Sequence, residues 1–284
     1  MISTHNSLVH ARFSRASQSY QAHAKIQQEI GKRLSERFDY YTIAPTHVLD
    51  LGAGTGVFSQ ALKKRFVSAR ITAFDLSSDM LSHLKSTWRR PIHKVAGDMQ
   101  TLPFKTNTFD VIYSNQVIHW ANDCAKLFKE IERVLTPSGV FVFSTLGPDT
   151  FKEISAAWQG ADNFSHVNQF PDMHSVGDEL VNAGFSEPVM DMERICVRYS
   201  SVKALAKDLK AQGVQHIGKS ARKGLMSPRV WRQFSENYEA FRDSDNCLPL
   251  SYEVIYGQAW GQAPKQSINQ KGEVIIPLSN LFNG

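Results

Sequence analysis

The chain has 284 residues, of which 42% are hydrophobic and 21% charged, and its formal net charge is +5 at pH 7. This apolar content excludes a disordered chain, and no apolar run approaches the roughly 18 residues that a membrane span needs. The N-terminus is polar and lacks the apolar stretch of a signal peptide. Three cysteines lie far apart and form no zinc or disulfide pattern, so we expect a cytoplasmic protein with no metal.

Helices and short apolar strands alternate along the first half of the chain. Ile26, Ile30 and Leu34 recur every four residues, as on the buried face of a helix. The sequence predicts helices over 15–38, 57–66, 78–88 and 123–135, and strands over 46–51, 70–74, 93–96, 108–114 and 139–145. Strands that alternate with helices indicate a parallel sheet covered on both faces.

The pattern is looser in the second half. Residues 147–173 are too long for an ordinary strand–helix loop, so we predict an inserted lid there. Further elements are predicted as helices over 174–185, 201–212 and 228–242 and strands over 189–199 and 251–260. We expect one domain over 1–262, with a helical segment over 12–40, a cofactor-binding core over 46–145, a helical cap over 200–245 and a tail over 263–284.

A glycine-rich turn over 52–56 directly follows the strand predicted at 46–51. Glycine there allows the backbone to approach a ligand closely. The spacing G-x-G-x-G differs from the G-x-G-x-x-G that binds a dinucleotide pyrophosphate. Asp50 stands just before the first glycine, where a carboxylate repels a pyrophosphate and attracts a cationic ligand.

Acidic residues follow the next two predicted strands. A carboxylate at Asp75 is placed to accept hydrogen bonds from the two hydroxyls of a ribose. Asp98 can accept the amino group of an adenine, while Met99 packs on the ring. Each acid alone is more often an ordinary polar residue at a strand end, but together they indicate an adenosine site.

With these motifs, residues 46–145 resemble the class I S-adenosylmethionine-dependent methyltransferases. The segments 109–115 and 135–140 also match that family's pattern. The resemblance implies an α/β, Rossmann-like fold: a seven-stranded mixed sheet with helices on both faces and an antiparallel last strand. It also implies S-adenosyl-L-methionine as cofactor, S-adenosyl-L-homocysteine as product, and cofactor contacts from Asp50, Gly52, Ala53, Gly54, Gly56, Asp75, Leu76, Asp98, Met99 and Asn115.

Three further segments, 12–20, 144–151 and 166–174, resemble the malonyl-acyl carrier protein O-methyltransferases of biotin synthesis. The similarity covers about residues 10–260, with Lys223 as a minor insertion-like departure. It implies methylation of the free carboxylate of a malonyl thioester held on an acyl carrier protein. A carboxylate is already ionised at neutral pH, so this reaction needs positioning and exclusion of water rather than a general base.

Candidate acceptor-site residues come from the N-terminal segment, the stretch that follows the fourth predicted strand, and the lid. Tyr20 is the first candidate for a neutral hydrogen-bond donor, and His119 and Phe170 complete the predicted catalytic set. Arg15, Trp120 and His174 are predicted to bind the substrate. For each of these residues a purely structural role is the alternative: a core tyrosine, a packed histidine, a solvated arginine or lid packing.

An acidic carrier protein calls for a basic docking surface. Lys126, Lys129 and Arg133 share one face of a predicted helix. Residues 194–232, which include Arg194 and Arg198, hold ten basic side chains against the single acid Asp208. A solvated charged face is the alternative reading of both clusters.

The sequence leaves two other functions open. One is methylation of a small free dicarboxylate such as aconitate, and the other is a methyltransferase-like assembly factor of respiratory complex I. Nucleic-acid methylation is disfavoured because residues 114–117 lack an Asn-Pro-Pro-Tyr-type motif. We expect no nucleic-acid or membrane partner and favour a monomer.

Overall fold

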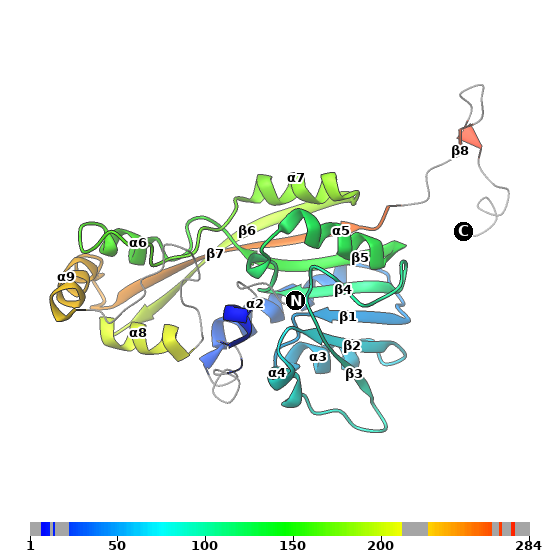
Figure 1. Cartoon of the computed structure of the whole chain (residues 1–284), viewed down its shortest axis with the longest axis horizontal. Helices are drawn as coiled ribbons and strands as arrows, with labels where there is room; N and C mark the ends of the chain where they lie inside the picture. The colour runs from blue at the N-terminus through cyan, green and yellow to red at the C-terminus, as the bar shows by residue number, and fades with distance from the viewer. Residues whose placement is uncertain are drawn as a thin grey trace.

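A seven-stranded sheet forms the centre of the protein, with the strand order β3-β2-β1-β4-β5-β7-β6 (Figure 1). The structure is a computed structural model, which describes residues 7–11, 14, 23–211, 227–262, 267–268 and 274–275. The strands are β1 (His47–Leu51), β2 (Arg70–Asp75), β3 (Ile92–Ala96), β4 (Phe109–Asn115), β5 (Leu135–Leu146), β6 (Ser186–Tyr199) and β7 (Leu248–Trp260). β7 runs antiparallel to both β5 and β6, whereas β1 to β5 pair in parallel. The predicted fold class, including the antiparallel last strand, is confirmed.

Helices cover both faces of the sheet because successive strand residues point to opposite sides. Val48 and Tyr113 pack in one buried cluster with α2, whereas Leu49 and Ile112 pack in a second cluster with α5. The helices are α2 (Lys25–Glu36), α3 (Val57–Arg65), α4 (Ser78–Ser82), α5 (Cys124–Val134), α6 (Lys152–Trp158), α7 (Met173–Ala183), α8 (Val202–Ala211) and α9 (Pro228–Glu239), with 3-10 turns η1 (Arg37–Tyr40) and η2 (Ile118–Trp120). Within the described part of the chain, no helix is both long and apolar enough to traverse a membrane.

The helix predicted over 78–88 is shorter than expected, since α4 ends at Ser82. Beyond it, Ser86 Oγ accepts a hydrogen bond from the Ile92 N–H at 2.9 Å, and Thr87 Oγ1 accepts one from the Arg90 N–H at 3.2 Å. These short side chains satisfy the backbone in a turn and so compete with continuation of the helix.

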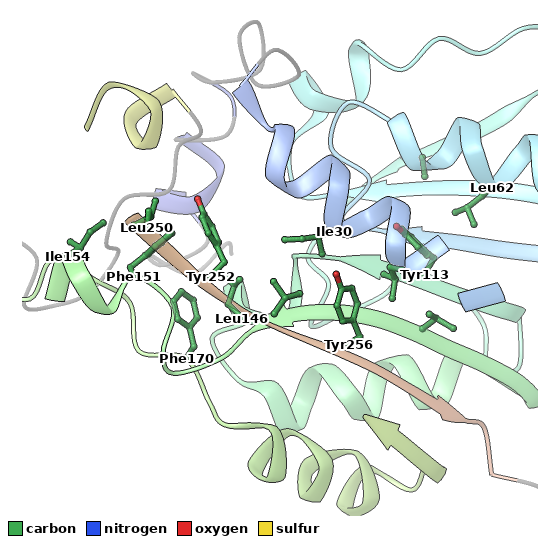
Figure 2. Packing of buried hydrophobic residues seen from close by; sticks show 14 of the residues in the cluster. Ile30, Leu62, Tyr113, Leu146, Phe151, Ile154, Phe170, Leu250, Tyr252 and Tyr256 are labelled. Carbon is green, nitrogen blue, oxygen red and sulfur yellow. The ribbon is translucent and has the colours of Figure 1, made fainter. Parts of the chain in front are cut away.

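Strands β6 and β7 extend past the rest of the sheet as a two-stranded arm. The β5–β7 pairing ends at Leu146 and Val254, but the β6–β7 pairing continues to Tyr199 and Leu248. Helices α6, α8 and α9 gather around this arm, at the left of Figure 1. Figure 2 follows one cluster of buried side chains from Leu62 of α3 to Leu250 and Tyr252 on the arm. The arm therefore shares the core of the sheet.

The predicted lid and cap pack against each other on this arm. Trp158 of α6 stacks on Phe234 of α9 with ring centroids 4.3 Å apart, and Asn237 donates a hydrogen bond to the carbonyl of Ala157 at 2.8 Å. Of the tail, the structure describes β8 (Ser267–Ile268) and β9 (Val274–Ile275), which pair antiparallel.

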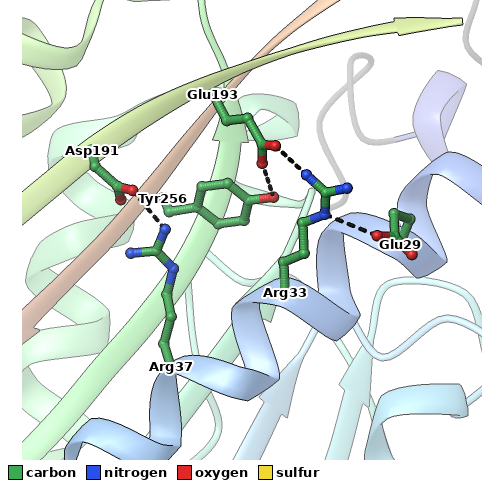
Figure 3. Close-up of polar contacts among 6 residues, drawn as sticks. All are labelled: Glu29, Arg33, Arg37, Asp191, Glu193 and Tyr256. Atoms are coloured by element: carbon green, nitrogen blue, oxygen red, sulfur yellow. Dashed lines mark hydrogen bonds and ion pairs between the residues drawn. The ribbon is translucent and has the colours of Figure 1, made fainter.

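Ionic contacts fix α2 against β6 and β7 (Figure 3). Arg33 bonds Glu29 of its own helix at 2.9 Å and also bonds Glu193 of β6. One turn later, Arg37 pairs with Asp191 at 2.7 Å and lies over the ring of Tyr256, 4.4 Å from its centre. These contacts anchor the C-terminal end of α2, and the start of η1, to β6 and β7.

Candidate active site

The glycine turn after β1 is fastened to the end of β2. The N–H of Gly54 donates a hydrogen bond to the Asp75 carboxylate at 2.8 Å, and the N–H of Gly52 donates to the carbonyl of Phe74 at 2.8 Å. Gly52 has a φ of 77°, and a Cβ there would come 2.2 Å from Val117 Cγ2. Glycine is therefore required at position 52 both for its conformation and for the packing of Val117, in the loop that follows β4.

Asp75 lies where the ends of β1 and β2 meet. Its second carboxylate oxygen accepts a hydrogen bond from the Ser77 N–H at 2.8 Å. Burial raises the pKa of Asp75, and the hydrogen bonds from Ser77 and Gly54 act in the opposite direction. Two backbone donors thus hold this carboxylate in one orientation at the edge of the sheet.

One cavity runs along the carboxyl ends of the strands, and we call it the strand-edge cavity. It brings together most of the residues predicted to bind the cofactor. It is lined by Val9, Gly52, Gly54, Phe74, Asp75, Leu76, Met80, Gly97, Asp98, Met99, Asn115, Gln116, Val117 and Trp120. Glycine, carboxylate and apolar side chains therefore meet in one place, as an adenosine site requires.

A second cavity, the turn cavity, lies between the glycine turn and α2. Gly52, Gly54 and Asn115 line both cavities, so the two adjoin. Asp50 and Ala53 line the turn cavity, together with Ala24, Gln27, Gln28, Thr55, Val57 and Phe58. The predicted residue Gly56 lines neither cavity and is instead the N-cap residue of α3, close against Leu84.

Asp50 is a buried carboxylate with only 2% of its surface exposed. Ser59 Oγ donates a hydrogen bond to it at 2.5 Å. Desolvation raises the pKa of Asp50 to about 7, opposed by the Ser59 hydrogen bond and aided by the nearby charge of Asp75. A cation in the turn cavity would offset this desolvation cost and favour the ionised form.

An aromatic chain runs from the strand-edge cavity toward the lid. The ring of His119 lies 5.1 Å from that of Trp120 and meets the ring of Phe170 edge-on at 5.5 Å. Thr145 Oγ1 lies 3.5 Å from His119 Nδ1. Desolvation lowers the pKa of His119 to about 3, so its imidazole is neutral at physiological pH. The other predicted acceptor-site residues, Tyr20 and Arg15, lie outside the described residues.

Among the residues of the strand-edge cavity that the sequence did not predict are Gln116 and Val9. Gln116 follows β4 with a φ of 60°, unusual for a residue other than glycine. Its N–H donates to Ser144 Oγ at 3.0 Å, and its side chain bonds the Thr145 carbonyl at 3.3 Å. Val9, from the described N-terminal residues, is buried over the cavity. Gln116 directly follows the predicted Asn115, whereas no local pattern points to Val9.

Two predicted substrate or carrier contacts do not fit the structure. His174 is exposed in the first turn of α7 and lines none of the cavities found in the described part of the chain. Arg133 is bound within the protein: it pairs with Glu130 at 2.8 Å and donates to the carbonyls of Phe104 and Leu102 at 2.8 and 3.0 Å. Its guanidinium holds a loop and is not free to dock a carrier.

The basic segment 194–232 is also partly neutralised by acids from elsewhere in the chain. Arg194 pairs with Asp149 at 2.9 Å, and Arg198 pairs with Asp245 at 2.6 Å. Both acids lie outside the segment, so its charge excess in the sequence overstated the free positive charge. Three exposed lysines of α8 share one helix face: Lys203, Lys207 and Lys210.

Comparison with known proteins identifies the family. Residues 49–143 match the family model of a methyltransferase domain. The malonyl-acyl carrier protein O-methyltransferase of Legionella pneumophila is 42% identical over 280 residues, which cover 98% of each chain. The enzyme of the same name from Gallionella capsiferriformans is 41% identical over 275 residues, or 94% of each chain.

Solved structures agree at the level of the fold. The YcgJ protein of Bacillus subtilis superposes with a TM-score of 0.56 at 17% identity, covering 81% of this chain and 98% of that one. Phosphoethanolamine N-methyltransferase 2 of Haemonchus contortus, in complex with S-adenosylhomocysteine, superposes with a TM-score of 0.51 at 17% identity, covering 83% of this chain and 52% of that one. The near full-length relatives decide the assignment: this chain belongs to the S-adenosylmethionine-dependent malonyl-acyl carrier protein O-methyltransferase family.

Proposed function

We propose that this enzyme transfers a methyl group to the free carboxylate of a malonyl thioester carried on an acyl carrier protein, as an early step of biotin synthesis. The full-length relatives carry this name at 42% and 41% identity. The observation in the structure that supports it best is the packing of His119 between Phe170 of the predicted lid and Trp120, which lines the strand-edge cavity.

The residues at the strand edges fit the cofactor. S-adenosylmethionine, when bound, supplies a methyl group on a cationic sulfur that leaves as a neutral thioether. Asp75 would hold the ribose, and Asp98 and Met99 the adenine. The buried carboxylate of Asp50 would stabilise positive charge in the turn cavity. Leu76 and Asn115 complete the walls.

The acceptor needs no proton transfer, because a carboxylate oxygen attacks directly and forms the ester bond as the carbon–sulfur bond breaks. A strong ion pair would lower the nucleophilicity of this oxygen. Neutral His119 offers a hydrogen bond without such a pair, and the buried ring of Phe170 helps to exclude water. Tyr20 and Arg15 stay candidates for a further donor and for a cation that orients the substrate.

For the carrier protein we retain a smaller docking surface than the sequence predicted. Lys126 and Lys129 are exposed on α5. They follow closely in sequence on Trp120, which lines the strand-edge cavity. Their positive charge complements an acidic carrier. Arg133, Arg194 and Arg198 are left out because each pairs with an acid of this chain.

The assay that tests the function compares acceptors. Purified enzyme is incubated with S-adenosylmethionine and, separately, malonyl-carrier protein, malonyl-coenzyme A, free malonate and aconitate, and S-adenosylhomocysteine formation is measured. The proposal expects turnover on the malonyl thioesters well above that on the free acids. Faster turnover of aconitate than of any malonyl thioester would contradict it.

A further inference from the structure

A third cavity, which we call the lid cavity, lies between α6 and the loop that leads to α7. Its volume is about 670 Å³, within the range of small-molecule sites. It is lined by Pro148, Thr150, Ser155, Trp158, Gln159, Asp162, Asn163, Phe164, Ser165, His166, Val167, Asn168, Gln169 and Phe170. None of these residues lines the strand-edge cavity or the turn cavity, and the known chemistry of methyl transfer does not use it.

Phe170 connects the lid cavity to the methyl-transfer site. It lines the lid cavity, and its ring contacts His119 at 5.5 Å. His119 in turn contacts Trp120, which lines the strand-edge cavity. The rings of Phe170, His119 and Trp120 thus form a continuous row from the lid cavity to the strand-edge cavity.

One wall of the lid cavity is rigid and aromatic. His166 stacks on Trp158 with ring centroids 3.6 Å apart and an interplanar angle of 8°. Trp158 also stacks against Phe234 of α9. His166 Nε2 lies 2.8 Å from Asp162 Oδ1, which fixes the ring. Such a flat, fixed wall suits the methylene and methyl groups of an extended chain.

The polar groups of the cavity are almost all neutral. Of the described residues that line it, none is Lys or Arg, and its acid Asp162 is paired with His166. The remaining polar side chains are amides and hydroxyls: Thr150, Ser155, Gln159, Asn163, Ser165, Asn168 and Gln169. This set would bind a carboxylate or a phosphate poorly, but it matches a neutral chain that carries amides and a hydroxyl.

We propose that the lid cavity binds the pantetheine arm of the malonyl thioester, so that the thioester end passes Phe170 and the malonyl group reaches His119. The inference rests on the proposed function. The amides and hydroxyl of the arm would bond the neutral side chains of the cavity, and its methylene groups would lie against His166 and the edge of Trp158 that lines the cavity. The arm is common to acyl carrier protein and coenzyme A, so both malonyl thioesters would use the cavity.

A matched pair of substitutions on α6 tests this. Ser155 and Ala156 are adjacent and exposed, but only Ser155 lines the cavity. Ser155→Trp would fill the cavity, and Ala156→Trp controls for a bulky residue on the same helix. KM is measured with malonyl-carrier protein, malonyl-coenzyme A and the S-ethyl malonyl thioester, which lacks the arm. Calorimetry with S-adenosylhomocysteine checks that the cofactor site is intact.

Loss of the hydrogen bonds of the arm predicts that Ser155→Trp raises KM about tenfold for both arm-bearing substrates. KM for the S-ethyl thioester and all values for Ala156→Trp should stay near wild type. If Ser155→Trp does not fold, the double variant Asn163→Ala/Gln169→Ala, also at exposed lining positions, should raise the same two KM values severalfold.

Three results would overturn the inference. Unchanged KM values for the arm-bearing substrates would show that the cavity does not bind the arm. An equal rise for the S-ethyl thioester would place the malonyl group there instead, and a rise for the carrier protein alone would indicate damaged protein docking. If the wild-type enzyme methylates none of the three thioesters, the proposed function fails, and the inference fails with it.

Discussion

The backbone N–H of Gly54 donates a hydrogen bond of 2.8 Å to the carboxylate of Asp75. This bond ties the glycine turn after β1 to the end of β2, so the two parts of the cofactor site are positioned by one interaction. Asp75 is also held by the Ser77 N–H. A ligand that bonds the outer side of this carboxylate would therefore meet a group that is already oriented.

Asp75→Ala should abolish measurable cofactor binding. The change removes a charged acceptor of two ribose hydroxyls, for which we expect a loss of affinity of about a hundredfold or more. Calorimetric titration with S-adenosylhomocysteine measures it. Asp79→Ala, at an exposed position in the first turn of α4, is the control and should bind as the wild type does. Equal affinity in both variants would refute the ribose role.

Cofactor binding should depend on pH through Asp50. Its pKa of about 7 in the unliganded protein reflects desolvation, and a bound sulfonium cation favours the ionised form. Affinity should therefore rise as pH increases from about 6 to about 8, with release of protons on binding. Calorimetry in buffers of different ionisation enthalpy detects this release, and Asp50→Asn should remove it. Proton uptake, or none in the wild type, would contradict the assignment.

His119 should affect acid stability in a definite direction. Its pKa of about 3 lies below the usual value near 6.5, so the unfolded chain takes up a proton before the folded one does. This group therefore lowers stability as pH falls from about 6.5 toward 3. The wild-type protein should therefore lose unfolding free energy between pH 8 and pH 5, and the His119→Gln variant should lose less. The difference is at most about 2 kcal/mol, and solvent screening makes it smaller.

The same variant tests the catalytic role of His119. Because the imidazole is neutral throughout this range, His119→Gln should lower kcat yet leave the shape of its pH profile unchanged. Denaturant titrations at the two pH values and initial rates from about pH 6 to pH 9 give both results. An inflection near pH 6.5 that disappears in the variant would mean that His119 titrates during catalysis.

Arg133 and the two lysines of α5 should behave differently when substituted. Arg133→Ala breaks charged hydrogen bonds to Glu130 and to two loop carbonyls, so we expect a loss of about 1–2 kcal/mol of stability. Its KM for malonyl-carrier protein should not change. Lys126→Glu/Lys129→Glu should raise that KM severalfold, spare malonyl-coenzyme A and leave the thermal midpoint nearly unchanged. A raised KM for malonyl-carrier protein in Arg133→Ala, with no change in the lysine double variant, would mean that Arg133 and not the lysines docks the carrier.

The strand-edge residues were predictable because their positions follow from local pattern. Parallel strands end at the same edge of a sheet, so Asp50, Asp75 and Asp98 had to come close once the strands were recognised. The helical spacing of Lys126, Lys129 and Arg133 was also right. What spacing could not show is that the Leu102 and Phe104 carbonyls, from a loop distant in sequence, bind the guanidinium of Arg133.

Features that depend on tertiary contacts were not predictable from the sequence. The left-handed conformation of Gln116 arises where β4 meets Ser144 of β5. The lid cavity depends on the stacking of Trp158 with both His166 and Phe234, which lie on separate segments. The length of residues 147–173 predicted an inserted lid, but their composition did not indicate that α6 packs against α9.

The most direct test of the account is to find the methyl group itself. Malonyl-carrier protein is incubated with the enzyme and S-adenosylmethionine labelled in the methyl group, and the pantetheine arm is released and analysed by tandem mass spectrometry. The account predicts one labelled methyl, on the free carboxylate of the malonyl group, as an ester that mild base removes. A label on carbon, sulfur or nitrogen, or no labelled product while S-adenosylmethionine binds normally, would contradict it.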